Sequence, residues 1–151
     1  AAVIISQGDL LLGSGVMVLG SGMDMLDGAV ARLSGKQNRI GAFLDSTLDR
    51  LGETFIFLGL IVYFVRLGSD SGVYLSATVL AVSLLISYLR AKGEAMGVSS
   101  DVGVMGRPER IVVLGIGLAF GQPLYGLGLI LLLGSLTFVQ RTVHIVRQVK
   151  G

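Results

Sequence analysis

The chain lacks cysteine and tryptophan, has only two prolines, and carries few charged side chains. The absence of cysteine excludes disulfides, thiol catalysis and thiolate metal sites. Charged residues make up 15% of the 151 residues, against about 25% in soluble proteins, and hydrophobic residues make up 52%. A chain of this composition cannot cover its surface with polar groups, so its solvent is expected to be lipid. There is also no basic stripe with interleaved aromatic side chains, and no nucleic acid partner is expected.

Long apolar runs divide the chain into segments, most of them near the roughly 20 residues that cross a bilayer. These runs cover 10–33, 40–65, 73–89, 110–121 and 124–143, after an apolar stub at 1–5. The run at 110–121 is the shortest, and a helix starting at Pro108 would lengthen it. Glycine is abundant, 23 of 151 residues, which favours close helix packing in a membrane. We predict one all-α transmembrane domain over 1–151, a six-helix bundle whose first helix is mostly missing from the chain.

The basic residues alternate between successive connections. Three Lys or Arg lie in 32–39, four in 90–110 and three in the tail from 141, whereas 6–9 and 121–123 have none and 66–72 has one. Lys and Arg are enriched in cytoplasmic loops. The pattern therefore predicts a multi-pass protein of the cell membrane, with five complete crossings and its basic connections on the cytoplasmic side.

Four aspartates occur within or at the edges of the first two long runs. Asp24 and Asp27 are three residues apart, and Asp45 and Asp49 are four apart, so on helices each pair shares a face. The short connection between the runs would bring the two faces together. Four carboxylates repel one another strongly at low dielectric, and hard divalent cations with oxygen ligands would neutralise them. Two such ions would balance the four charges near the cytoplasmic face.

The aspartates belong to a longer pattern, Asp24-x2-Asp27-Gly28-x2-Ala31-Arg32-x8-Gly41-x3-Asp45-x3-Asp49. This pattern resembles the signature of the CDP-alcohol phosphotransferases, integral membrane enzymes of phospholipid synthesis. All eight signature positions match over 26 residues. The resemblance implies a six-helix core in which the hydroxyl of an acceptor attacks a CDP-linked lipid and releases CMP.

The resemblance also implies a role for each aspartate. Asp24, Asp27 and Asp45 would hold two divalent ions, Mg²⁺ or Mn²⁺. Asp49 would complete the metal site and act as the general base that takes the proton of the acceptor, for which it must lie within hydrogen-bond reach of the hydroxyl.

The remaining signature positions would bind the CDP-lipid. Gly28 would permit close approach of the cytidine nucleotide, and Ala31 and Gly41 would act likewise. Arg32 lies one turn further on and would contact a phosphate with its planar guanidinium.

A second basic segment concerns the acceptor. Tyr88-x-Arg-Ala-Lys92 and Arg107-Pro-Glu-Arg110 resemble stretches of the phosphatidylinositol phosphate synthases of actinobacteria and the archaetidylinositol phosphate synthases of archaea. By that resemblance the inositol phosphate pocket would include Lys92, Arg107, Arg110 and Arg141. A solvated basic loop facing lipid headgroups is the alternative interpretation. Two residues apart on a helix, Arg90 and Lys92 do not share a face.

These patterns favour transfer of a phosphatidyl or archaetidyl group from CDP-diacylglycerol or CDP-archaeol to inositol 1-phosphate. Glycerol 3-phosphate is the alternative acceptor, which would make the chain a phosphatidylglycerophosphate synthase. A homodimer is expected by resemblance only. The acidic cluster is also compatible with an acid-lined divalent cation transporter, and with ion pairs to Arg32, Lys36 or Arg50 that merely hold helices together.

Overall fold

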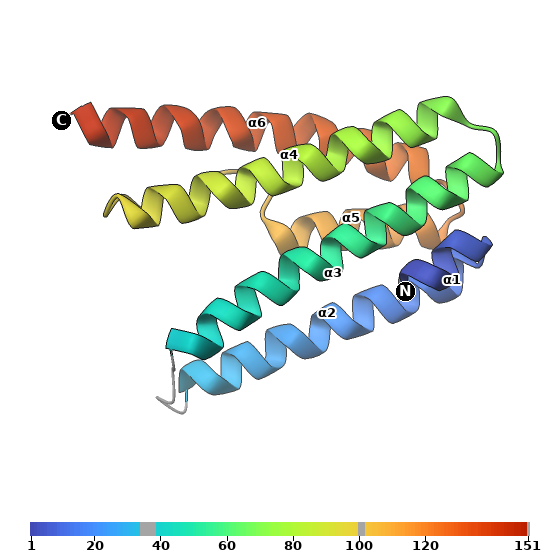
Figure 1. Ribbon diagram of the computed structural model, residues 1–151, viewed down its shortest axis with the longest axis horizontal. Helices are drawn as coiled ribbons and strands as arrows, with labels where there is room; N and C mark the ends of the chain where they lie inside the picture. The colour runs from blue at the N-terminus through green and yellow to red at the C-terminus, as the bar shows by residue number, and fades with distance from the viewer. Residues whose placement is uncertain (34–38, 100–101, 151) are drawn as a thin grey trace.

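The computed structural model describes residues 1–33, 39–99 and 102–150, and of residues 24–33, 39 and 150 it describes the main chain only. This part of the chain forms six α-helices and no strand (Figure 1). The helices are α1 (Ala2–Gln7), α2 (Leu10–Leu33), α3 (Arg39–Arg66), α4 (Asp70–Ala95), α5 (Arg107–Ala119) and α6 (Pro123–Lys150). The all-α prediction is confirmed, and each apolar run corresponds to one helix.

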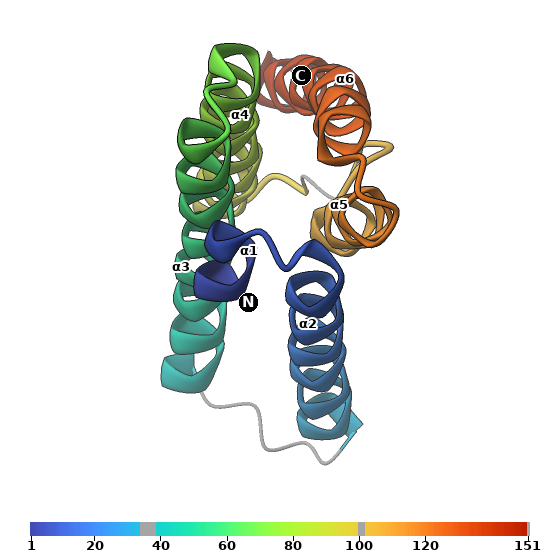
Figure 2. The same cartoon turned by 90° about the vertical axis from the view of Figure 1, so that its right-hand side faces the viewer.

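Among the described residues, the helices that pack closely form a closed ring. The neighbouring pairs are α1–α2, α2–α5, α5–α6, α6–α4, α4–α3 and α3–α1, and Figure 2 views this arrangement end on. Because α1 is only six residues long, it closes the ring only where α2 begins and α3 ends. Towards the other end of the ring, the second half of α2 and the first half of α3, which carry the aspartate pattern, extend beyond α1 (Figure 2).

Glycines set the distance between α5 and α6. A Cβ atom added to Gly117 would lie 3.2 Å from the Cα atom of Gly126, so the two backbones touch there. The turn between these helices contains Gly121, whose φ of +66° lies in the left-handed region that favours glycine. Pro123 then begins α6, as expected from its position.

Within the described residues, two helices are long and apolar enough to cross a bilayer, Asp70–Ala95 and Pro123–Val149, and α2 contributes a shorter apolar stretch, Leu10–Met23. Large apolar side chains such as Phe43 and Phe120 are exposed. The apolar exterior fits a membrane protein. The five complete crossings stay a prediction, since α3 carries several charged residues and α5 has only 13 residues.

The two ends of the bundle differ in charge. The connections α1–α2, α3–α4 and α5–α6 lie at one end (Figure 1). They contain no Lys or Arg, and Arg66 is the last residue of α3. The last turn of α4 and the C-terminus of α6 lie at the opposite end, together with the start of α3. The basic residues that end α4 and α6 therefore lie at the end of the bundle opposite to these connections.

Candidate active site

A row of three acidic side chains runs along α3 from the open end of the ring towards its interior. Asp45, Asp49 and Glu53 follow one another at four-residue intervals, so they share one face of the helix. Asp45 is exposed, the Asp49 side chain is 19% exposed and the Glu53 side chain is 7% exposed. The row thus passes from solvent into the bundle, and Glu53 extends the predicted pair by one turn.

The other two aspartates of the pattern lie on the last turns of α2. The main chain is helical through Asp24 and Asp27, as the spacing requires, and their side chains lie outside the described part of the chain. Leu33 and Arg39 are separated by six residue steps, so the ends of α2 and α3 are at most about 20 Å apart. The two aspartate pairs therefore belong to the same end of the bundle.

The four positions expected to contact the CDP-lipid lie at this end as well. Gly28, Ala31 and Arg32 are on the same helical stretch of α2, again with side chains outside the described residues. Gly41 lies exposed in the first turn of α3, four residues before Asp45. The arrangement of these residues around a nucleotide stays a prediction.

Two ion pairs cross the interior of the ring from α3 to α5. Nη1 of Arg107 lies 2.7 Å from Oδ1 of Asp49. Arg110 donates twice to Glu53, with Nε 2.9 Å from Oε1 and Nη2 3.2 Å from Oε2. Arg110 is 3% exposed, so this second pair is fully buried. The helices α3 and α5 are thereby connected by charged side chains at two successive turns.

The segment before α5, residues 102–106, lies against α6. A pocket remains between this segment and the two ion pairs. At 13 residues, α5 spans only about 20 Å, and it begins inside the bundle (Figure 1). The main-chain nitrogen of Met105 donates to Oγ1 of Thr137 at 3.0 Å, and Nε of Arg141 donates to the carbonyl of Val102 at 2.9 Å. These two contacts anchor the segment to α6.

A polar pocket of about 300 Å³ opens beside this segment. It brings together three of the four basic residues expected to bind the acceptor, Arg107, Arg110 and Arg141, and it also contains Asp49. The structure therefore brings these three residues together, and their role in acceptor binding stays a prediction. All three guanidinium groups already have protein partners: Arg107 contacts Asp49, Arg110 binds Glu53, and Nη1 of Arg141 donates to the carbonyl of Ile86 at 3.1 Å.

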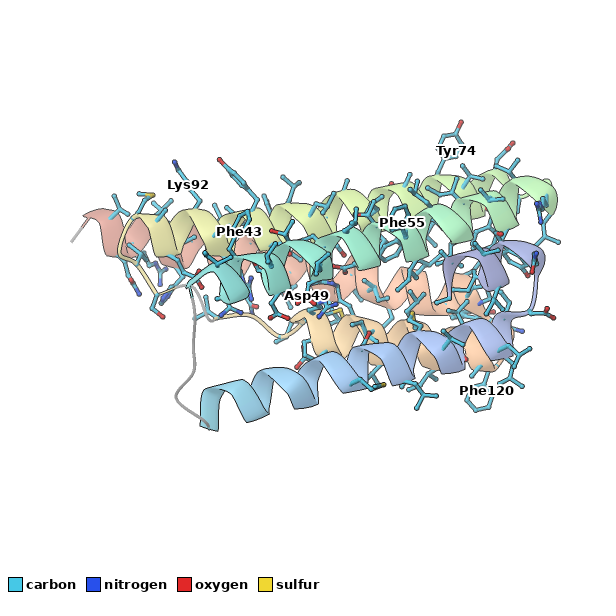
Figure 3. All side chains as sticks on the ribbon, turned by 60° about the horizontal axis from the view of Figure 1, so that its bottom comes forward. Phe43, Asp49, Phe55, Tyr74, Lys92 and Phe120 are labelled. Carbon is cyan, nitrogen blue, oxygen red and sulfur yellow. The ribbon has the colours of Figure 1, made fainter. Side chains whose placement is uncertain are left out.

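Lys92 is the fourth expected acceptor residue, and the structure does not bring it to the pocket. Its side chain is exposed and lies on the side of α4 that faces away from Asp49 (Figure 3). Arg90 lines the pocket instead, and its Nε contacts Oε1 of Glu94 at 2.9 Å. Because Arg90 and Lys92 are two residues apart, they do not share a face of the helix. Which of the two faces the pocket depends on the orientation of α4, which the sequence alone does not give.

A second cavity, of about 510 Å³, lies on the other side of the ion pairs. Its lining is mostly apolar and comes from α1, α2, α3 and α5, with Met17, Phe55 and Leu114 among the side chains. Glu53, Arg107 and Arg110 line both this cavity and the polar pocket. The ion pairs therefore form the boundary between an apolar and a polar compartment.

Glu53 and Arg90 are site residues that the sequence patterns did not single out. Glu53 could have been found by continuing the four-residue spacing from Asp45 and Asp49, since a third carboxylate on a lipid-embedded helix requires a partner. Its partner, Arg110, was expected to bind the acceptor. The pairing could not be read from the sequence because it depends on the packing of two helices that are not adjacent in the chain.

Residues 1–146 match the family model described as CDP-alcohol phosphatidyltransferase. The chain belongs to this family. The match covers almost the whole chain and includes every signature position on α2 and α3, so the resemblance noted in the sequence is confirmed.

Similar chains include synthases of inositol phospholipid phosphates. The chain is 44% identical over 85 residues to a phosphatidylinositol phosphate synthase of Mycolicibacterium smegmatis, covering 55% of this chain and 38% of the relative. It is 31% identical to an archaetidylinositol phosphate synthase of Methanothermobacter thermautotrophicus, covering 73% of this chain and 57% of the relative. The chain thus spans about half the length of such relatives, less in the first case.

Solved structures of the phosphatidylinositol phosphate synthase of Mycobacterium tuberculosis have the same fold. The structure with CDP-DAG bound superposes with a TM-score of 0.85 at 31% identity, covering 95% of this chain and 78% of that one. The structure of that enzyme in complex with manganese and citrate gives the same TM-score and identity, covering 95% of this chain and 74% of that one. The membrane-enzyme fold of this family therefore holds along nearly the whole chain.

Proposed function

We propose that this CDP-alcohol phosphatidyltransferase moves a phosphatidyl or archaetidyl group from a CDP-lipid to inositol 1-phosphate and releases CMP. The observation that carries the proposal is the position of Asp49. This carboxylate lines a polar pocket with five arginines, Arg90, Arg107 and Arg141 among them, while an apolar cavity lies directly behind the adjacent Glu53–Arg110 pair. A polar acceptor in the pocket and a lipid chain in the cavity would thus lie on the two sides of the Glu53–Arg110 pair, one helical turn from Asp49.

The chemistry follows from this placement. The acceptor hydroxyl oxygen attacks the phosphorus next to the lipid glycerol, the bond from that phosphorus to the CMP oxygen breaks, and the hydroxyl proton passes to Asp49. A general base of this kind contributes about 10² to 10⁴ in rate. Arg107 contacts Asp49. An acceptor whose phosphate is bound by Arg107 would therefore have its hydroxyl groups near the base.

The donor set fits divalent cations. Asp45 and Asp49 offer hard carboxylate oxygens one turn apart, and Asp24 and Asp27 belong to the facing end of α2. Among the side chains that the structure describes, no group of three or more His, Cys, Asp or Glu lies close enough to hold a metal, so the site requires α2. We propose two ions, Mg²⁺ or Mn²⁺, held by these four aspartates. When bound, they would neutralise the pyrophosphate of the CDP-lipid.

The donor is expected to enter from the lipid side. Gly28, Ala31, Arg32 and Gly41 would bind its cytidine diphosphate near the ends of α2 and α3. The cavity of about 510 Å³ has a mostly apolar lining, and this suits a portion of the hydrocarbon chain of CDP-diacylglycerol or CDP-archaeol. Its location between α1, α2, α3 and α5, with Glu53 one turn from Asp49 in its lining, supports this assignment.

Orientation in the membrane is part of the proposal. The basic end of the bundle would face the cytoplasm, where nucleotide-linked substrates are found, and the helices would cross the cell membrane several times. A homodimer, implied by the resemblance, is also included. The mass of the protein in detergent tests the dimer, and labelling of a cysteine introduced at Arg66 or Lys92 from either side of sealed vesicles tests the orientation.

The experiment that tests the function uses the full-length protein in liposomes with a cytidine-labelled CDP-lipid and Mg²⁺. CMP release is followed with inositol 1-phosphate, free inositol or glycerol 3-phosphate, each with and without EDTA. We expect metal-dependent release with inositol 1-phosphate alone. Release with glycerol 3-phosphate alone would instead identify a phosphatidylglycerophosphate synthase. No release with any acceptor, together with uptake of a divalent cation into the liposomes, would favour the transporter.

A further inference from the structure

We propose that Glu53 is a positioning residue of the acceptor pocket. It holds Arg110 and, through the first turns of α5, sets the position of Arg107 opposite Asp49. Glu53 lies outside the signature pattern, which ends at Asp49. The proposal rests on the proposed function, because it concerns the pocket in which the acceptor would bind.

The geometry of the Glu53–Arg110 pair shows that it is fixed. Both carboxylate oxygens accept from the guanidinium, and the two side chains are 7% and 3% exposed. A bidentate contact restricts the orientation of the arginine as well as its distance. The neighbouring pair differs, since Arg107 and Asp49 are 25% and 19% exposed and face the polar pocket. Of the two pairs, the one made by Glu53 is the more buried, and its two contacts restrict the orientation of the arginine.

Stability alone does not account for a buried pair of this kind. Two charges taken from water lose hydration, and an apolar pair of similar size stabilises a fold as well or better. A glutamate and an arginine at this place therefore point to a requirement for orientation. That requirement is found one turn away, where Arg107 must face both the pocket and Asp49.

The first turn of α5 has few other constraints from α3. The close packing of α5 is against α2 and α6. Its N-cap, Gly106, provides no side-chain hydrogen bond, so the helix start is not fixed by a cap. Arg110 lies three residues after Arg107 on the same face of α5. Holding Arg110 against α3 therefore holds Arg107 against α3 as well.

A charge argument separates this role from a simple electrostatic one. Glu53 lines the pocket that would receive a phosphate. If Glu53 acted only through its charge, Glu53→Gln would remove a repulsion and improve binding of an anionic acceptor. If Glu53 positions Arg110 and Arg107, the same change weakens binding, because glutamine cannot accept from both guanidinium nitrogens through two oxygens. The two roles predict changes of opposite sign.

Glu109→Gln is the matched control. Glu109 is exposed, lines the same pocket and carries the same charge, and it is not the partner of Arg110. We expect Glu53→Gln to raise the KM for inositol 1-phosphate about tenfold and to change the KM for the CDP-lipid less than about twofold. Glu109→Gln should leave the acceptor KM equal or lower. Equal or lower acceptor KM in both variants would overturn the proposal.

A second measurement keeps the test independent of folding and of the assigned reaction. Arg110→Lys retains the positive charge but removes the planar group, so positioning predicts a similar rise in the acceptor KM, whereas a charge role predicts no change. Binding of inorganic phosphate is measured on the same proteins. Loss of phosphate binding in Glu53→Gln but not in Glu109→Gln would support the role of Glu53 even if inositol 1-phosphate proves to be the wrong acceptor. Unaltered phosphate binding in both Glu53→Gln and Arg110→Lys would refute it.

Discussion

The two sides of α5 are built in opposite ways. Towards α6, Gly117 meets Gly126 and the two backbones touch. Towards α3, Arg107 and Arg110 reach acidic partners across the interior of the ring. The glycine side leaves no space between the helices, whereas the charged side borders both the polar pocket and the apolar cavity. In this fold, room for substrates exists where long side chains hold helices apart.

This contrast separates scaffold from site. Glycines let helices associate in a membrane, where the hydrophobic effect does not drive helices together. A charged side chain within a membrane is costly unless it has a partner. Charged residues that occur there are therefore most often functional. Substitutions on the glycine side should therefore alter stability, and those on the charged side should alter activity.

The largest effect is expected from Asp49→Asn. If Asp49 is the base, this change should lower kcat about 10³-fold, because the amide cannot take the proton. Binding of metal and of CDP-lipid should fall much less, and both are measured separately by titration. Asp9→Asn, at an exposed position of the opposite end of the bundle, is the control and should be neutral. Parallel loss of metal binding and turnover would show that Asp49 is above all a metal ligand.

The next largest effect is expected from Gly126→Leu on the glycine side. A Cβ at this position would lie 3.3 Å from the carbonyl oxygen of Val113 and 3.5 Å from the Cα of Gly117, so α5 and α6 would have to separate. Overpacking of this kind costs about 1–3 kcal/mol. We expect the unfolding free energy in detergent to fall by about 2 kcal/mol.

Gly128→Leu is the control for that loss. It is the same substitution on the same helix, and a Cβ at Gly128 would meet nothing within 4 Å. A surface change of this kind should alter the unfolding free energy by less than about 0.5 kcal/mol. Equal destabilisation by both leucines would mean that the glycines matter for helix conformation and not for close packing.

Much of the scaffold could be predicted from the sequence. The boundaries of α2 and α3 follow from apolar runs that end in charged or polar residues, and the short α5 follows from Pro108 and a run that barely crosses a bilayer. The helical extensions were not predicted. The apolar run at 73–89 continues as helix to Ala95, and the run at 124–143 continues to Lys150, because a helix does not end where its surroundings become polar.

The site was only partly predictable. The eight signature positions could be read from the motif spacing, and the grouping of Arg107, Arg110 and Arg141 followed from the resemblance, which also included Lys92. The partners of those arginines could not. Whether Arg110 faces a phosphate or Glu53 depends on the rotation of α5 relative to α3, and these helices are separated in the chain by the whole of α4. The main-chain contacts of Arg141 likewise depend on how the segment before α5 folds back.

A smaller effect is expected from Arg141→Lys, on the charged side. Arg141 donates from Nε to the carbonyl of Val102 and from Nη1 to that of Ile86, so it connects α4, α6 and the segment before α5. Lysine keeps the charge but cannot reach both carbonyls in the same plane. We expect the acceptor KM to rise about fivefold to tenfold, which corresponds to about 1 kcal/mol.

Arg147→Lys, on the exposed last turns of α6, is the control for Arg141→Lys and should be neutral. If Arg141→Lys leaves the acceptor KM unchanged but lowers the thermal midpoint, Arg141 belongs to the scaffold in spite of its place in the pocket. That result would assign this part of α6 to the scaffold and confine the acceptor site to the side of the pocket formed by α3.

The smallest effect is expected from Lys92→Ala, which sharpens the contrast at α4. Lys92 and Arg90 differ by about 200° around the helix, and only Arg90 lines the polar pocket. We expect Lys92→Ala to change the acceptor KM less than about twofold, because screened surface charges act weakly at a distance. Arg90→Ala should raise it several-fold more than Lys92→Ala does. If Lys92→Ala instead raised the acceptor KM more than Arg90→Ala, α4 would have to turn Lys92 towards the pocket when the acceptor binds. Lys92 would then belong to the acceptor pocket, as the resemblance implies.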